Sequence, residues 1–314
     1  MFRVPLLLLA LAAAVSGQPP TIGDCPIFPA DNVWNTPVDR LPVSAFSLRY
    51  IKSIGPGRTL HADFGTDMKG GGIPYAVVPA DQPAVSVTFE YADDSDRGPY
   101  PIPPNPPIEG GGGDGHILLV QKGVCKLYEL FAVSLQPNGK WKAGSGAVFD
   151  LKSNALRHDG WTSADAAGLP IVPGLIRYDE VEAGAINHAL RLTVPRTRKA
   201  HIWPARHDAS SNTDPVYPPM GERFRLKADF DVSTFPEDAQ VVLTALKRYG
   251  MILADNGSSW YLTGAPDSRW NMDTITKIKG VTGADLEAVD TSSMRINLNS
   301  GQARPAPVKD SAIR

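Results

Sequence analysis

Proline and glycine occur along the whole chain, and they limit the folds that it can adopt. The sequence holds 29 prolines and 29 glycines among its 314 residues. Both residues interrupt helices and favour turns, so an architecture of long helices is disfavoured. Apolar residues still make up 42% of the chain, which is enough for a sizeable core. Short strands joined by turns are therefore the expected elements.

Several segments have the alternation or the β-branched content of strands. They are residues 85–91, a hairpin of 117–121 with 124–134, and 147–151, 188–194, 201–204 and 223–230. Two helices are expected, one over 234–249 with Thr234 as its N-cap and a shorter one over 271–279. The sequence thus predicts a mainly β fold, a single β-sandwich or jelly-roll-like domain with a few short helices.

The first residues have the pattern of an export signal. Arg3 precedes an apolar run of about a dozen residues, and small residues follow at 15–17. The run is shorter than the roughly 20 residues that cross a bilayer. We therefore expect a signal peptide over 1–17, one globular domain over 18–300 and a polar tail over 301–314. The mature protein is expected to have no membrane span and to be secreted or periplasmic.

The chain has two cysteines, Cys25 and Cys125. An oxidising compartment favours a disulfide between them. Two buried free thiols are the alternative, and a zinc site is disfavoured because the sequence lacks a CxxC pair.

Charge and motifs exclude several functions. Lys and Arg number 31 against 33 Asp and Glu, a net charge of −2, so we expect no binding to nucleic acid through a basic surface. The sequence contains no nucleotide-binding glycine motif, no HExxH and no GxSxG. Function must therefore be inferred from groups of residues that the fold brings together.

The hairpin supplies the first such group. With a two-residue turn, paired residue numbers add up to 245 or 247, and in either register His116 and Glu129 share one face of the sheet. Asp114 lies on the same face, and the glycine run 110–113 leads into it. Burial raises the pKa of a carboxylic acid, which suits a general acid at neutral pH. A purely structural His–Glu pair is the alternative.

A second group follows in the segment 158–170. Asp165 could provide another carboxylate, and Trp161 a flat surface for a sugar ring. Thr162 and Asp165 also fit a capping box, which would make this segment the start of a short helix.

Further candidates for substrate binding are histidines and neighbouring residues on the predicted strands and turns, namely His188, His201, Trp203 and Arg206. Their spacing does not specify a metal site with His116, so neither a metal nor another cofactor is predicted.

These residues favour a secreted carbohydrate-active enzyme, specifically a glycoside hydrolase acting on an extracellular polysaccharide or oligosaccharide. Such chemistry needs two carboxyl groups beside the scissile bond. Glu129 would provide one and Asp114 or Asp165 the other, with His116 tuning Glu129. The alternatives are a polysaccharide lyase, in which Arg206 neutralises a uronate, and a non-catalytic carbohydrate-binding or envelope protein. The oligomeric state is left open.

Overall fold

The strand β6 (Ile117–Gln121) is an inner strand of a four-stranded sheet and is buried along its whole length. This computed structural model describes residues 18–110 and 113–305. The side chains of Leu118 and Val120 belong to the main core, and those of Ile117 and Leu119 belong to a second, smaller core. Alternate residues of a strand point to opposite faces, so β6 serves both cores at once.

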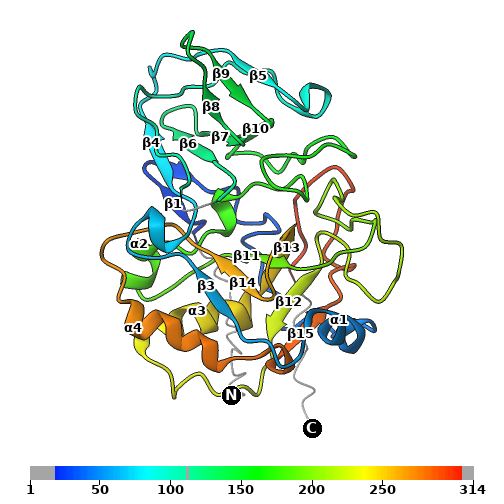
Figure 1. Ribbon diagram of the computed structural model, residues 1–314. Helices are drawn as coiled ribbons and strands as arrows, with labels where there is room; N and C mark the ends of the chain where they lie inside the picture. The colour runs from blue at the N-terminus through cyan, green and yellow to red at the C-terminus, as the bar shows by residue number, and fades with distance from the viewer. Residues whose placement is uncertain (1–17, 111–112, 306–314) are drawn as a thin grey trace, which may run out of the picture.

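The four-stranded sheet that contains β6 has the order β10-β7-β6-β4. Its other strands are β4 (Tyr75–Val78), β7 (Lys126–Phe131) and β10 (Ser145–Asp150). A three-stranded sheet of β5 (Val87–Phe89), β9 (Trp141–Ala143) and β8 (Ser134–Leu135) lies at the top of Figure 1. Tyr100 packs edge-to-face against Phe89 and Tyr128, which joins these two sheets.

The six-stranded sheet occupies the lower part of Figure 1, in the order β15-β12-β13-β11-β14-β3. Its strands are β15 (Leu286–Val289), β12 (Arg223–Leu226), β13 (Met251–Asn256), β11 (Leu190–Val194), β14 (Tyr261–Thr263) and β3 (His61–Asp63). The pairs β11–β13 and β14–β3 are parallel, whereas β11–β14, β12–β13 and β12–β15 are antiparallel. The sheet is therefore mixed.

Short helices surround these sheets. They are α1 (Ser47–Ile54), α2 (Tyr178–Glu182), α3 (Glu237–Arg248) and α4 (Met272–Ile275), and single turns of 3-10 helix occur at Met68–Gly70, Ala92–Asp94, Val172–Gly174, Thr276–Gly280 and Gly283–Asp285. Helix α3 packs against β12 through its apolar face. The mainly β class with a few short helices is confirmed.

Three local predictions were wrong. Thr234 does not cap α3, because the helix begins only after Pro236, whose fixed φ suits a helix start. Residues 162–165 form no helix, since the Thr162 hydroxyl faces backbone carbonyls. His201 makes only an isolated bridge to Met220 and starts no strand. The chain stays packed through Ala303, which is buried, whereas the predicted signal peptide and the end of the polar tail lie outside the described residues.

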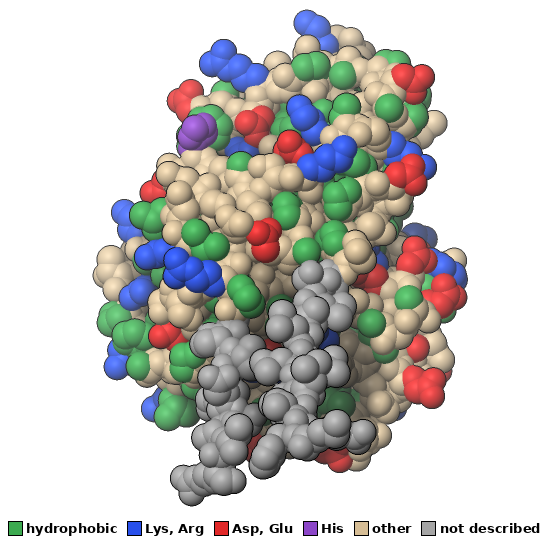
Figure 2. All heavy atoms as spheres, turned by 180° about the vertical axis from the view of Figure 1, so that it is seen from behind, with side chains coloured by type: hydrophobic (Ala, Val, Ile, Leu, Met, Phe, Trp, Pro, Cys, Tyr) green, Lys and Arg blue, Asp and Glu red, His purple; other side chains and the backbone are tan. Residues whose placement is uncertain are grey.

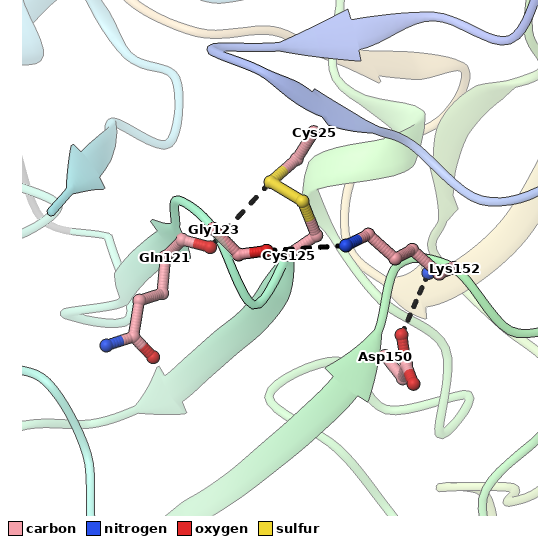
Figure 3. Close-up of a disulfide and its surroundings, with 6 residues drawn as sticks. All are labelled: Cys25, Gln121, Gly123, Cys125, Asp150 and Lys152. Carbon is pink, nitrogen blue, oxygen red and sulfur yellow. Dashed lines mark hydrogen bonds between the residues drawn. A yellow bond between two sulfur atoms is a disulfide. The ribbon is translucent and has the colours of Figure 1, made fainter. Parts of the chain in front are cut away.

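A disulfide joins Cys25 to Cys125, with Cα atoms 5.2 Å apart, and confirms that prediction. It connects β2 (Cys25–Pro26), which pairs with β1 (Thr21–Ile22), to the turn between β6 and β7 (Figure 3). Beside it, the Lys152 ammonium donates to the carbonyl oxygen of Gly123. No helix among residues 18–110 and 113–305 is long and apolar enough to span a membrane.

Candidate active site

A row of polar side chains crosses three neighbouring strands of the six-stranded sheet. Asp63 on β3 pairs with Thr263 on β14, and the antiparallel register places Arg191 of β11 beside Thr263. The guanidinium of Arg191 donates a 2.7 Å hydrogen bond to the Thr263 hydroxyl. Leu190 and Leu192, which alternate with Arg191, belong to the main core. In β11, Arg191 thus lies on the opposite face from these leucines, and the candidate site lies on the Arg191 side.

Arg191 holds two aspartates together. Its Nε and Nη2 donate to the two carboxylate oxygens of Asp165, both at 2.7 Å, and Nη2 lies 3.3 Å from Asp255 Oδ2. Asp165 is buried, whereas the Asp255 side chain is 22% exposed. Burial and the charge of Asp165 raise the pKa of Asp255 to about 7, against the opposing charge of Arg191, and Asp255 also shares a hydrogen bond with Asp165. Asp255 is therefore a carboxyl group that keeps its proton near neutral pH.

Glu109 and His116 form the second part of the site. The Nδ1 of His116 lies 2.6 Å from Glu109 Oε2, and its Nε2 lies 3.0 Å from the carbonyl oxygen of Ala164. Because both ring nitrogens face acceptors, the protonated imidazole can donate to both. Burial opposes the charged forms, but their mutual hydrogen bond and charge outweigh it. The pKa of Glu109 is consequently lowered and that of His116 raised.

Asp63 is the remaining carboxyl group of the candidate site. Burial raises its pKa, and the nearby charge of Glu109 raises it further, whereas His61 and Arg191 lower it. Its carboxylate accepts no hydrogen bond from the described residues. Asp63 is thus a partly exposed carboxyl group, beside Arg191 and Glu109, that is available to a ligand.

Glycines bring two loops against these carboxyl groups. Gly71 has a φ of 93°, and a Cβ at this position would lie 3.3 Å from Asp63 Oδ1. A Cβ on Gly113 would lie 2.6 Å from Glu109 Oε1. The loops meet where Gly110 approaches Met68. Only glycine leaves room for the carboxyl groups at these contacts.

Glu129 is more deeply buried than these carboxyl groups, and its carboxylate has different hydrogen-bond partners. Glu129 pairs with Leu118 of β6, so the numbers of paired residues in this hairpin add up to 247. In this register Glu129 shares a face with His116, one diagonal step away. Its carboxylate accepts hydrogen bonds from the backbone N–H groups of Ile171 and Val172 at 2.9 Å. Burial raises its pKa to about 7. Glu129 was expected to provide a carboxyl group beside the scissile bond, but it is 0% exposed. Its carboxylate binds the start of a 3-10 turn.

The sequence-predicted residues are only partly brought together. Asp165 and His116 belong to the site, but Asp114 is exposed on the loop before β6. Trp161 packs beside His158 and under Arg157, at ring-centroid distances of 4.8 Å and 5.6 Å.

The four other predicted binding residues make contacts of their own elsewhere. His188 is buried against Glu180 and Arg177, and His201 lies between Asp159 and Asp208. The indole of Trp203 donates to the Ser300 carbonyl oxygen. Arg206 donates to the carbonyl oxygens of Arg157 and Leu298. These side chains stabilise loops through the contacts described.

Sequence reasoning missed Asp63, Glu109, Arg191 and Asp255. Asp255 lies near the end of β13, shortly before the turn to β14, and Glu109 directly precedes the glycine run, so each had a weak local signal. Arg191 alternates with buried leucines in a strand, which is an unusual place for a charged side chain. That alternation is the signal that could have found it.

Comparisons with protein families, with curated proteins and with solved structures found no match to this chain. Within the described ranges, no group of three or more His, Cys, Asp or Glu side chains could hold a metal ion.

Proposed function

We propose that this protein is a glycoside hydrolase acting on a polysaccharide or oligosaccharide, with Asp255 and Glu109 as its catalytic carboxyl groups. The observation that carries the proposal is the opposite pKa shift of two partly exposed acids that both lie near Arg191. The pKa of Asp255 is raised to about 7, whereas that of Glu109 is lowered. Environments that separate the pKa values of two acids assign them opposite roles in proton transfer.

The roles follow from these charges. Asp255 gives its proton to the glycosidic oxygen as the bond to the anomeric carbon breaks. Ionised Glu109 either removes a proton from the attacking water or attacks the anomeric carbon itself, and water then completes the hydrolysis. Both routes consume one water molecule. When Glu109 is the nucleophile, the second step returns a proton from water to Asp255; when Glu109 is the base, the proton that it gains must pass to solvent and Asp255 must regain one from solvent.

Two neighbours act as positioning residues. His116 holds the Glu109 carboxylate through the 2.6 Å contact. Arg191 binds Asp165 beside Asp255, and the charge of Asp165 favours the protonated form of Asp255. Neither His116 nor Asp165 needs to contact the substrate for these roles.

An extracellular or periplasmic location fits the same proposal. The disulfide between Cys25 and Cys125 is typical of proteins that fold in an oxidising compartment. Acidic and basic side chains both occur across the face seen in Figure 2, which agrees with a near-neutral chain.

The lyase alternative loses its expected cation. Arg206 was to neutralise a uronate, but its guanidinium donates to the carbonyl oxygens of Arg157 and Leu298 and is buried. Hydrolysis needs a proton donor and an ionised carboxylate at the scissile bond, the two roles for which Asp255 and Glu109 are suited, so hydrolysis is the better proposal.

The test is a screen of the purified mature protein against polysaccharides. Cleavage is monitored by the appearance of reducing ends and by the absorbance of unsaturated products. On a substrate that is cleaved, Asp255→Asn and Glu109→Gln should each lower kcat by about 10²-fold or more. Glu182→Gln, which changes an exposed carboxylate paired with Arg269, should retain full activity and is the matched control.

Three outcomes would overturn the proposal. Binding of oligosaccharide without turnover would indicate a binding protein, and unsaturated products would indicate a lyase. Full activity in the Asp255→Asn and Glu109→Gln variants would move the reaction away from this site. If Glu109 is the nucleophile, azide should restore turnover to a Glu109→Ala variant, because a small anion can replace the missing carboxylate.

A further inference from the structure

An aromatic pair lies two residues along the strands from the candidate carboxyl groups. His61 on β3 and Tyr261 on β14 are cross-strand partners, and their rings stack with centroids 4.1 Å apart and an interplanar angle of 20°. The next pair on this face is Asp63 and Thr263. Two residues of a strand span about 6.6 Å, so a sugar at the rings would be a neighbour of a sugar at Asp63.

A lysine lies close to this pair. Lys279 belongs to the 3-10 turn Thr276–Gly280, which packs along β3. Its side chain is exposed and makes no ion pair or hydrogen bond with the part of the chain that the structure describes. Burial lowers the pKa of His61, and the charge of Lys279 lowers it further, against the charge of Asp63. The His61 ring is therefore neutral at neutral pH, and Lys279 provides the positive charge.

We propose that His61, Tyr261 and Lys279 form a subsite that binds an acidic sugar next to the bond that is cleaved. This inference rests on the proposed glycoside hydrolase function and specifies its substrate class, a glycan that contains uronate units. The half-buried rings offer apolar surface to the sugar. The ammonium of Lys279 would pair with the sugar carboxylate as a point charge.

The two cations among the candidate carboxyl groups are already engaged. Arg191 is bound by Asp165, Asp255 and Thr263, and His116 is bound by Glu109 and the Ala164 carbonyl oxygen. Lys279, by contrast, makes no such contact with the described residues and lies on the turn that packs along β3. The raised pKa of Asp255, about 7, also reduces the negative charge that a uronate would meet.

The experiment compares matched variants on two substrates. Initial rates are measured with a uronate-containing oligosaccharide and with a neutral one, at low and high salt. Lys279→Gln should raise KM for the acidic substrate about tenfold and leave its kcat unchanged. The kinetics with the neutral substrate should not change. The increase in KM should be smaller in high salt, because screening weakens exposed charge pairs. Lys277→Gln, on the same 3-10 turn and also exposed, is the control and should leave both substrates unaffected.

A second measurement tests the rings. Tyr261→Ala should weaken binding of the acidic oligosaccharide to the Asp255→Asn variant, as titrated by calorimetry, whereas Tyr261→Phe should retain most of it. An active enzyme that prefers neutral substrate, or whose KM for acidic substrate is unchanged in Lys279→Gln, would overturn the acidic subsite alone. Absence of turnover on every glycan would instead overturn the proposed function.

Discussion

Glu222 shows at the level of one residue how burial sets the pH response of this protein. The residue lies just before β12, is 4% exposed, and its carboxyl group accepts no hydrogen bond from the described residues. Burial raises its pKa to about 8; the charge of Asp290 adds to this shift, and that of Arg198 opposes it. The folded protein therefore binds the Glu222 proton more tightly than the unfolded chain does.

We expect stability to fall with rising pH because of this group. The contribution of Glu222 to the free energy of unfolding is complete below the pKa that this group has in the unfolded chain, near 4.5. It is lost as pH rises through about 8, the pKa in the folded protein. Between these values the loss approaches about 1.4 kcal/mol per pH unit at most. Chemical denaturation of the wild type and of Glu222→Gln between pH 5 and pH 9 would check this, and the variant should show the smaller decline.

Glu90→Gln, which changes an exposed carboxylate, is the control and should follow the wild type at every pH. A Glu222→Gln curve parallel to the wild type would assign the pH response to Glu129 or Asp255, whose pKa values are also raised to about 7.

At the level of elements, loops rather than strands decide the shape of the candidate site. The strands β3, β11 and β14 fix Asp63, Arg191 and Thr263 by register. The loops beside Gly71 and Gly113 then pass against the carboxyl groups of Asp63 and Glu109. Small changes in these loops should therefore affect activity more than folding.

Gly113→Ala provides a direct test of the second loop. The added Cβ would lie 2.5 Å from Glu109 Cδ, so the carboxylate must move away from His116. We expect kcat to fall about tenfold or more, while the melting temperature changes by only a few degrees. Gly57→Ala, where a Cβ would meet nothing within 4 Å, is the control for adding a methyl group. Unchanged kcat in Gly113→Ala would show that the position of Glu109 does not matter for turnover.

At the level of the whole molecule, the N-terminal segment is held by covalent and polar contacts. Arg223 donates to the carbonyl oxygens of Val33 and Tyr249, and Arg225 donates to those of Val38 and Leu41. These buried arginines join β12 to residues 33–41. The Cys25–Cys125 disulfide joins the preceding residues to the four-stranded sheet.

Removing this disulfide should destabilise the entire fold. The bridge closes a loop of 100 residues, and the loop-entropy relation gives it about 4–5 kcal/mol. The Cys25→Ser, Cys125→Ser double variant should therefore unfold at lower denaturant concentration, in one transition if the N-terminal segment unfolds with the rest. An early separate transition would show that this segment is an independent unit. Non-reducing peptide mapping of the wild type provides the check that the bridge is formed.

The sequence by itself determined the β-rich class, the Cys25–Cys125 pairing and the shared face of His116 and Glu129. These features depend on neighbours along the chain, on turn geometry or on the presence of one cysteine pair, so local rules suffice. Only the tertiary structure brought Asp63, Glu109, Asp165, Arg191 and Asp255 together. Their proximity depends on parallel and antiparallel pairing between distant strands and on loops that close over them. The pKa shifts that suggest catalysis arise from burial and neighbouring charges, which no single segment of the sequence contains.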